Sequence, residues 1–330
     1  MKPKVLHIGK AGNMERYAAD PELLNTIELT DLPMGLPIEE YLKQAKDAQV
    51  IVADAIAKIP RELIEGMPEL LLIHSEGVGY NGVDLNAASE KKVLVCNCQG
   101  MNASAVAEQT ILLMLGVLRD VKNGDQAVYD GNQITKKENY MKQGNLLELA
   151  DCKVGLVGFG DIAKSVAKLL NAFHAEVFYY KRTPESRETE EEYGASYLPL
   201  DKLLSSCNMI SMHVPVTEKT YHMANDAFFE KMQDGSYFIN TARGEVADSE
   251  AIVRALKSGK LAMAGMDTLE FEPVQKDHIL VNQPDEIREK MLFSPHIGGI
   301  TASSFRRGYG MIWKAIRDVS EGKTPHNVVN

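Results

Sequence analysis

Short aliphatic runs alternate with amphipathic stretches along the first hundred residues, and this alternation predicts strands and helices in turn. Runs of consecutive apolar residues are typical of strands that are buried on both faces of a parallel sheet. Four such runs lie at residues 5–8, 50–53, 70–73 and 93–96. Helical patterns separate them at residues 38–45, 61–66 and 84–90. This order indicates an α/β unit with a parallel sheet.

A second series follows a long helical pattern at residues 103–119. Its six predicted strands are residues 154–157, 177–180, 209–213, 237–240, 263–266 and 292–293. A final helical stretch covers residues 304–321. Six strands with helices between them match a complete dinucleotide-binding sheet. A chain of 330 residues is long enough for two domains with separate cores.

A glycine turn opens this second series, with the sequence Gly158-Phe159-Gly160-Asp161-Ile162-Ala163. A strand, a glycine turn and a helix start together form a binding site for a dinucleotide pyrophosphate. The six residues alone also fit a strand-to-helix turn without a ligand. The next predicted strand, residues 175–180, completes a βαβ unit of the expected length and favours the dinucleotide.

Lys181-Arg182-Thr183 stands at the end of that next strand, where an acid would accept hydrogen bonds from the ribose of NAD. Cations and a hydroxyl favour a 2′-phosphate instead, so NADP(H) is predicted over NAD(H). The alternative is that Lys181 and Arg182 are solvated charges. Asp161 brings a carboxylate near the expected phosphates, unless its side chain points to solvent.

Composition and charge exclude several classes of protein. The formal net charge of −10 argues against a nucleic-acid partner, which requires basic patches. The four cysteines lack metal-ligand spacing, so we expect core residues and no metal site. The start of the chain has no signal-peptide pattern, and the longest apolar run, residues 111–115, is too short to cross a bilayer. The sequence therefore predicts a soluble cytoplasmic protein without membrane partners.

Two further motifs stand at predicted strand ends in the second series. Arg243, within residues 240–244, is placed to bind a carboxylate, because parallel strands direct their carboxyl ends toward the ligand. The alternative is an arginine paired with a neighbouring acid. Glu272 and His296 follow the last two strands, and a carboxylate on one imidazole nitrogen makes the other more basic. Such a histidine can exchange a proton with a carbonyl or hydroxyl oxygen. His213, at another strand end, is read as lining the cofactor site.

Residues 75–81 form a glycine turn after the third strand of the first series. Its backbone N–H groups are candidates for binding an anion, although taken alone the segment is only a turn.

Taken in order, these motifs resemble the D-isomer-specific 2-hydroxyacid dehydrogenase family over nearly the whole chain. The set comprises Gly77-Val78-Gly79-Tyr80-Asn81 with Val83-Asp84, Val106-Ala107-Glu108, Val157-Gly158-Phe159-Gly160, His213-Val214-Pro215 with Thr220, Asn240-Thr241-Ala242-Arg243-Gly244, Asp267 with Glu272-Pro273, and Pro295-His296-Ile297-Gly298-Gly299. The resemblance implies reduction of a small 2-oxo acid to the D-2-hydroxy acid by NAD(P)H.

The resemblance also implies roles for individual residues. Arg243, Glu272 and His296 would be catalytic, with Arg243 binding the carboxylate and 2-oxo group, and Val78 and Gly79 would give N–H groups to the carboxylate. The expected cofactor contacts are Gly158, Phe159, Gly160, Asp161, Ile162, Lys181, Arg182, Thr183, His213, Val214, Pro215, Thr220, Thr241, Ala242, Arg243, Asp267, His296 and Gly298.

The implied fold is a pair of doubly wound parallel-sheet domains. A flavodoxin-like substrate domain, residues 1–101 and 300–330, would be interrupted by a Rossmann cofactor domain, residues 102–299. The active site would lie in the cleft between them. Family members are usually homodimers that pair largely through the cofactor domain, near the helix at residues 103–119.

Three charged residues depart from the family pattern: Lys181 in the usual acid position, Asp161 at the turn, and Glu76 beside the anion-binding turn. Glu76 is a candidate substrate contact for a distal amine or hydroxyl, but a solvent-facing side chain is the preferred interpretation. Asn81 replaces a common aspartate. Two other functions fit the same fold: formate or phosphite oxidation, which the Glu272–His296 pair disfavours for formate, and a dinucleotide-sensing corepressor.

Overall fold

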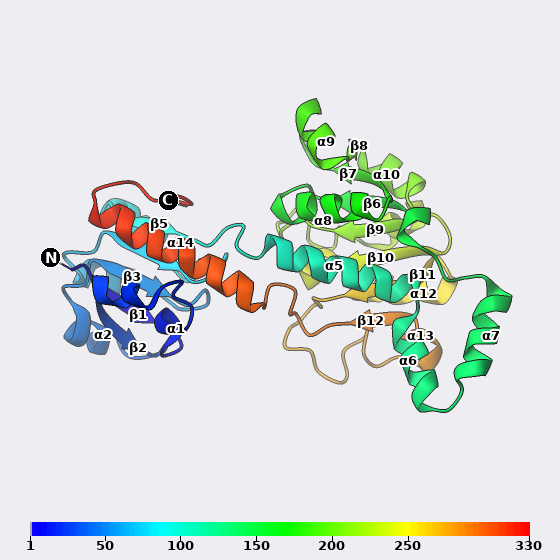
Figure 1. The fold of residues 1–330 in the computed structure, drawn as a ribbon, viewed down its shortest axis with the longest axis horizontal. Helices are drawn as coiled ribbons and strands as arrows, with labels where there is room; N and C mark the ends of the chain where they lie inside the picture. The colour runs from blue at the N-terminus through cyan, green and yellow to red at the C-terminus, as the bar shows by residue number, and fades with distance from the viewer. Residues whose placement is uncertain (1) are drawn as a thin grey trace. The chain divides into compact units, whose positions relative to one another are not determined.

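The computed structural model describes residues 2–330, and it divides into two compact units. The first comprises Met1–Asn102 with Ile300–Asn330, and the second comprises Ala103–Gly299. The two units are coloured blue-to-cyan with red and cyan-green-to-orange in Figure 1. Both contain a parallel sheet with helices on its two faces, as the sequence predicts.

The first unit has a five-stranded sheet with the order β2-β1-β3-β4-β5, which is the flavodoxin-like order. Its strands are β1 (Lys4–Ile8), β2 (Glu28–Leu32), β3 (Val50–Ala53), β4 (Leu72–Ser75) and β5 (Leu94–Cys96). Its helices are α1 (Asn13–Arg16), α2 (Ile38–Ala45), α3 (Arg61–Gly66), α4 (Leu85–Glu90) and α14 (Ala302–Ser320).

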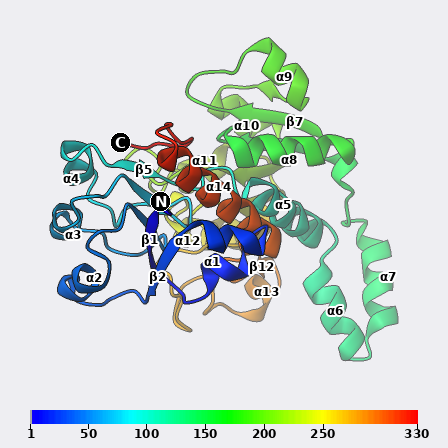
Figure 2. The same ribbon diagram turned by 60° about the vertical axis from the view of Figure 1, so that its left-hand side comes forward.

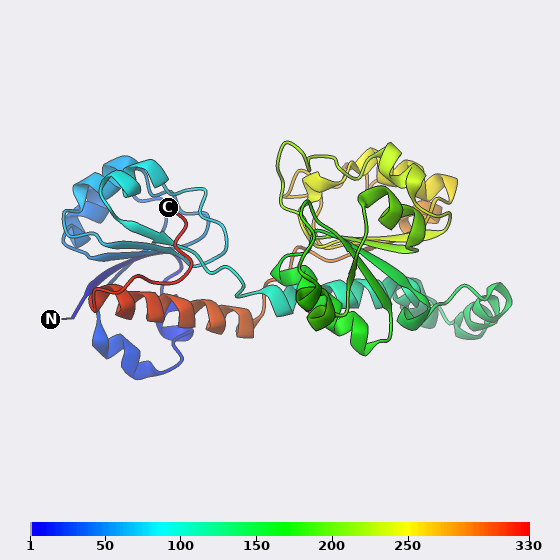
Figure 3. The same cartoon turned by 90° about the horizontal axis from the view of Figure 1, so that it is seen from above.

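Alternate strand residues of this sheet face two separate cores. One core packs α2, α3 and α4 against residues such as Leu6 and Ile51. The other packs α1 and α14 against residues such as Val5 and Val52. Figure 3 shows the two helix layers on opposite faces of the sheet. Helix α14 begins after Gly299 and returns the chain to the first unit, which explains why this unit is built from two separate segments.

The second unit has a seven-stranded parallel sheet with the order β12-β11-β10-β9-β6-β7-β8. Its strands are β6 (Lys153–Val157), β7 (Glu176–Tyr180), β8 (Ser196–Tyr197), β9 (Met209–Met212), β10 (Ser236–Asn240), β11 (Leu261–Met266) and β12 (Met291–Phe293). The sequence predicted six of these strands and missed the two-residue β8.

The helices of the second unit cover both faces of this sheet. They are α5 (Ala103–Leu118), α6 (Val121–Tyr129), α7 (Gln133–Gln143), α8 (Asp161–Ala172), α9 (Arg187–Tyr193), α10 (Leu200–Ser206), α11 (Asp226–Lys231), α12 (Ser249–Ser258) and α13 (Asp285–Arg288). Helices α5 and α8 share one core and α10, α11 and α12 the other. The chain order reverses between β6 and β9, and this switch point is where ligands bind in such sheets.

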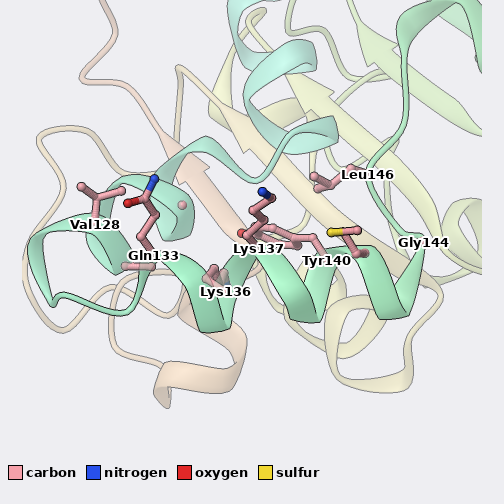
Figure 4. A pocket seen from close by; sticks show the side chains of 10 residues that line it. Val128, Gln133, Lys136, Lys137, Tyr140, Gly144 and Leu146 are labelled. Carbon is pink, nitrogen blue, oxygen red and sulfur yellow. The ribbon is translucent and has the colours of Figure 1, made fainter.

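Helices α6 and α7 form a hairpin that projects from the second unit (Figure 2). A cavity of about 380 Å³ is lined by the two helices and the residues that follow them. Figure 4 shows Val128, Lys137, Tyr140 and Leu146 around it. Several large apolar side chains of the hairpin are exposed, including Val128, Tyr129, Ile134 and Met141. Of the helices in residues 2–330, none combines the length and the apolar character that crossing a membrane requires.

Candidate active site

The glycine turn connects β6 to α8, and its two glycines have different surroundings. Gly158 has a φ of 99°, and a Cβ there would lie 2.5 Å from the carbonyl oxygen of His213. Gly160 immediately precedes α8, and a Cβ there would meet no atom within 4 Å. The backbone is therefore open at Gly160, which fits the approach of a pyrophosphate to the helix N-terminus.

The side chain of Phe159 is not available to a cofactor. It is buried and stacked on Tyr179, with ring centroids 4.1 Å apart. Only the backbone of Phe159 faces the turn. Ala163 is fully buried, in keeping with close packing of α8 on the sheet, while Ile162 is half-buried and Asp161 is exposed. The Asp161 carboxylate thus points to solvent, as one of the two sequence interpretations stated.

Glu185 lies beside the cations that follow β7, and the sequence analysis did not predict this acid. Lys181 Nζ binds the carboxylate of Glu185, and Lys164 Nζ of α8 lies 3.5 Å from the same oxygen. The hydrogen bond from Lys181, together with the charge of Lys164, holds the pKa of Glu185 below its ordinary value. Lys181 is therefore ion-paired, whereas Arg182 and Thr183 are exposed. Glu185 stands at i+4 from Lys181, a spacing that offered a signal.

The loop after β9 is organised by its own polar groups. His213 Nε2 lies 2.9 Å from Ser211 Oγ, and burial lowers the pKa of His213 to about 4. The imidazole is therefore neutral at pH 7. The Thr220 hydroxyl donates to Pro215 O at 2.6 Å. Thr220 thus holds the Val214-Pro215 segment, and this contact differs from the direct cofactor contact that the sequence suggested.

Arg243 follows β10 in an exposed position with an open guanidinium. Its Nη1 donates to Ala242 O at 2.7 Å, and within residues 2–330 no carboxylate lies within 4.0 Å of it. Asn240 Nδ2 donates to Arg243 O at 2.9 Å and fixes the turn, while Thr241 is buried against Thr110. The alternative of an arginine bound to a neighbouring acid is wrong.

Glu272 and His296 are in direct contact. His296 Nδ1 lies 2.6 Å from Glu272 Oε2, and the N–H of Leu269 donates to Glu272 Oε1 at 3.1 Å. Because an ionised carboxylate only accepts, Nδ1 carries the proton of this hydrogen bond. The imidazole Nε2 is left free for a substrate. The side chains are 45% and 35% exposed, so the pair is accessible.

Asp267 holds the loop that carries His296. Its carboxylate is buried and accepts hydrogen bonds from Ser294 Oγ at 2.5 Å, Ile297 N at 3.0 Å and Gly298 N at 2.8 Å. A Cβ at Gly298 would lie 2.9 Å from Asp267 Oδ2, so this glycine permits the contact. Asp267 therefore fixes the conformation of the loop that carries His296. The sequence analysis did not predict this structural role.

A cavity of about 730 Å³ lies beside this pair. It is lined by Asp267, Leu269, Glu272, Pro273, Val274, Val281, Phe293, Ser294, Pro295 and His296. Its wall is mainly apolar with polar groups concentrated at the Glu272–His296 pair, which is the usual character of a small-molecule site.

In the first unit, the turn after β4 presents two free backbone donors. The carbonyl oxygens of Gly77, Val78 and Gly79 accept bonds from Cys98 N, Asn97 Nδ2 and Ser75 Oγ respectively. Within the described residues, the N–H groups of Val78 and Gly79 have no acceptor. Both residues are exposed. The turn is thus fixed through its carbonyls and leaves two N–H groups available for an anion.

Glu76 does not face solvent, which corrects the preferred sequence interpretation. It is 9% exposed, and its Oε1 lies 2.9 Å from His7 Nε2 and also accepts from the Tyr309 hydroxyl. His7 Nδ1 in turn lies 2.7 Å from Asp31 Oδ1. A carboxylate can stay buried here because a histidine and a hydroxyl bind it. The sequence separation of these residues hid the network.

Comparison with protein families gives one match, to the model for the D-isomer specific 2-hydroxyacid dehydrogenase, NAD binding domain, over residues 111–298. Among curated proteins, glyoxylate reductase of Thermococcus litoralis is 32% identical over 305 residues, covering 92% of this chain and 90% of that protein. Hydroxypyruvate reductase of Thermotoga maritima is 33% identical, covering 90% of this chain and 93% of that protein.

Solved structures give the same picture. The apo form of D-mandelate dehydrogenase from Rhodotorula graminis is 26% identical with a TM-score of 0.83, covering 100% of this chain and 98% of that one. A glyoxylate reductase from Paecilomyes thermophila is 27% identical with a TM-score of 0.79, covering 99% of this chain and 98% of that one.

Proposed function

Because this chain belongs to the D-isomer specific 2-hydroxyacid dehydrogenase family, and so reduces 2-oxo acids with NAD(P)H, we propose that glyoxylate or hydroxypyruvate is its substrate. The curated relatives named above act on these two acids. The observation that carries the mechanism is the Glu272–His296 contact with its free Nε2. Reduction yields the 2-hydroxy acid, which is achiral glycolate from glyoxylate and the D isomer of glycerate from hydroxypyruvate.

His296 is the proton donor in this mechanism. A bound NAD(P)H would supply the hydride that C2 of the 2-oxo acid accepts and would leave as NAD(P)+. His296 Nε2–H gives its proton to the carbonyl oxygen, so the substrate becomes an alcohol and the imidazolium becomes a neutral imidazole. Glu272 holds the imidazole through Nδ1 and stabilises its protonated form. In the reverse direction the neutral imidazole removes the proton from the hydroxyl.

Arg243 binds the substrate carboxylate and the 2-oxo group. A guanidinium presents several N–H donors in one plane, and that of Arg243 uses one of them on Ala242. In the first unit, the N–H groups of Val78 and Gly79 have no acceptor within the described residues, and they stay the predicted backbone donors to a carboxylate. These residues bind and orient the acid, and orientation lowers the barrier without direct participation in proton transfer.

NADP(H) is the proposed cofactor in preference to NAD(H). Gly158 and Gly160 with the N-terminus of α8 fit a pyrophosphate. The exposed Arg182 and Thr183 suit a 2′-phosphate, and Lys181 would exchange its Glu185 partner for that phosphate. Lys181→Asp is expected to shift the ratio of kcat/KM values for NADPH and NADH toward NADH. Steady-state kinetics with both cofactors measures this ratio, and an unchanged ratio would remove Lys181 from the account.

A homodimer that uses the α6–α7 hairpin and α5 is the proposed assembly. The support is the exposed apolar surface, since Tyr129 is 82% exposed, Met141 75% and Leu112 59%. Large apolar side chains that gather on an exposed surface commonly mark an interface. Tyr129→Glu with Met141→Glu is expected to give monomers by sedimentation velocity, and a monomeric wild-type protein would reject the assembly. The cytoplasmic location stays a prediction.

A substrate panel tests the proposed function. Oxidation of NADPH and NADH is followed with glyoxylate, hydroxypyruvate, pyruvate and phenylpyruvate, and reduction of NADP and NAD with formate and phosphite. We expect the highest kcat/KM with glyoxylate or hydroxypyruvate. Turnover restricted to phenylpyruvate would reject the proposed substrate. A protein that binds the dinucleotide without turning over any acid would favour the sensing function over the catalytic one.

A further inference from the structure

His222 and Glu270 form a second histidine–carboxylate pair in the cofactor-binding unit, outside the catalytic pair. The Glu270 side chain is only 3% exposed, and its Oε1 lies 2.5 Å from His222 Nε2. The His222 ring stacks on Tyr221 with centroids 4.1 Å apart. A carboxylate so deeply buried requires partners, and removing one leaves an uncompensated charge.

The other carboxylate oxygen of Glu270 binds the far end of the Arg243 loop, defined here as residues 243–249. Ser249 N, at the start of α12, donates to Glu270 Oε2 at 3.0 Å. His222 also binds this loop, because its backbone N–H donates to Glu245 O at 2.9 Å. The Arg243 loop is therefore held at two points, by the backbone of His222 and by the side chain of Glu270. The ion pair between His222 and Glu270 links these two contacts.

Gly244 shows how closely these segments pack. A Cβ at Gly244 would lie 1.9 Å from Leu269 C and 2.2 Å from Glu270 N, so the two backbones are in direct contact beside Arg243. Any movement of the Leu269–Glu270 backbone would therefore displace Gly244. Leu269 N also donates to Glu272. The Leu269–Glu270 segment therefore borders both Arg243, the proposed carboxylate-binding residue, and the proposed acid–base pair Glu272–His296.

The backbone of His222 is held in an uncommon conformation. Its φ is 48°, in the left-handed region that residues other than glycine seldom adopt. Such a conformation persists only where surrounding contacts determine it, and these sites are often functional. The contacts to Glu270 and Glu245 provide that determination for His222.

We propose that His222 and Glu270 are positioning residues that fix the Arg243 loop and so orient the Arg243 guanidinium toward the substrate carboxylate. Neither residue touches the substrate. The pair acts through the contacts at Gly244, Glu245 and Ser249. This inference rests on the proposed role of Arg243.

Two substitutions break the pair while preserving shape. His222→Phe keeps a ring against Tyr221 and removes the nitrogen, and Glu270→Gln keeps the size and removes the charge. Lys231→Met is the matched control, because it breaks an exposed ion pair with Asp201 in the same unit. We expect the first two to lower kcat/KM for glyoxylate by about 10–100-fold, as misplaced binding groups do, with the Kd for NADPH unchanged. Lys231→Met leaves both values unchanged.

A double-mutant cycle with Arg243→Ala separates positioning from general destabilisation. If the pair acts through Arg243, His222→Phe lowers kcat/KM by less than about 3-fold in the Arg243→Ala enzyme, because coupled residues do not add. If His222→Phe lowers kcat/KM by the same factor in the wild-type enzyme and in the Arg243→Ala enzyme, the inference is overturned. If His222→Phe and Glu270→Gln both have a normal kcat/KM while Arg243→Ala is impaired, the positioning role is rejected and the proposed role of Arg243 stands. A normal kcat/KM for Arg243→Ala would reject the proposed role of Arg243 in binding the substrate carboxylate.

Discussion

The two units each contain a histidine bound to a glutamate, but the two pairs have opposite surroundings. In the first unit, His7 is 0% exposed and both ring nitrogens bind carboxylates, those of Asp31 and Glu76. In the second unit, His296 is 45% exposed and binds Glu272 through one nitrogen. The same chemical groups therefore have a saturated arrangement in one unit and an open arrangement in the other.

This difference assigns different work to the two histidines. A proton donor must have a nitrogen that a substrate can reach, and of these two histidines His296 has one and His7 does not. His7 instead joins β1 to Asp31 on β2, to Glu76 after β4 and, through Glu76, to Tyr309 on α14. We infer that His7 stabilises the first unit and that His296 performs chemistry. Loss of His7 should affect folding, and loss of Glu272 or His296 should affect turnover.

The largest expected effect is on stability, for His7→Leu. This change leaves the buried Glu76 carboxylate and the half-buried Asp31 carboxylate without their imidazole partner, and breaking a buried pair costs about 3–5 kcal/mol. The single tryptophan of the chain, Trp313, lies buried on α14 and reports on unfolding of this unit. Urea titration followed by tryptophan fluorescence measures the loss.

The matched change in the second unit is Glu272→Gln, whose expected effect is on rate. The amide cannot stabilise a protonated imidazole, so kcat for glyoxylate reduction is expected to fall by roughly 10²-fold. Because the pair is accessible to water, the urea midpoint reported by circular dichroism is expected to change little. A large shift of that midpoint with normal kcat would reverse the comparison between the two pairs.

The smallest effect concerns pH. Burial lowers the pKa of His7, but its hydrogen bonds to Glu76 and Asp31 and their negative charges outweigh burial, and the net shift raises the pKa above its ordinary 6.5. A raised pKa stabilises the folded state fully below pH 6.5, and this contribution is lost as pH rises through the raised value.

The stability difference between the wild type and His7→Leu is therefore expected to shrink as pH increases above 6.5. Urea titrations of Trp313 fluorescence at several pH values measure it. A difference that grows with pH would contradict a protonated His7.

Much of the fold was predictable from apolar runs. The boundaries of α2, α3 and β3 agree with the sequence pattern because their buried positions recur at regular spacing. Strand β2 was missed because it is an edge strand in which three of the five residues are polar and one side chain is buried. Helices α6 and α7 were missed because they have no buried residue.

The site was predictable where its residues follow strands, as Arg243, Glu272 and His296 do. Long-range partners were not, because nothing local marks them. Glu76 meets His7 across 69 residues, and Asp267 meets Gly298 across 31. Glu270 stood two residues before Glu272 in the sequence, but its partner His222 lies 48 residues away.

The most direct test of the central claim is kcat for glyoxylate reduction by His296→Ala, measured beside His7→Leu under conditions in which circular dichroism and Trp313 fluorescence show both variants to be folded. General acid catalysis contributes about 10²–10⁴-fold, so we expect a loss in this range for His296→Ala and less than about 5-fold for His7→Leu. A His296→Ala enzyme with near wild-type kcat would contradict the account.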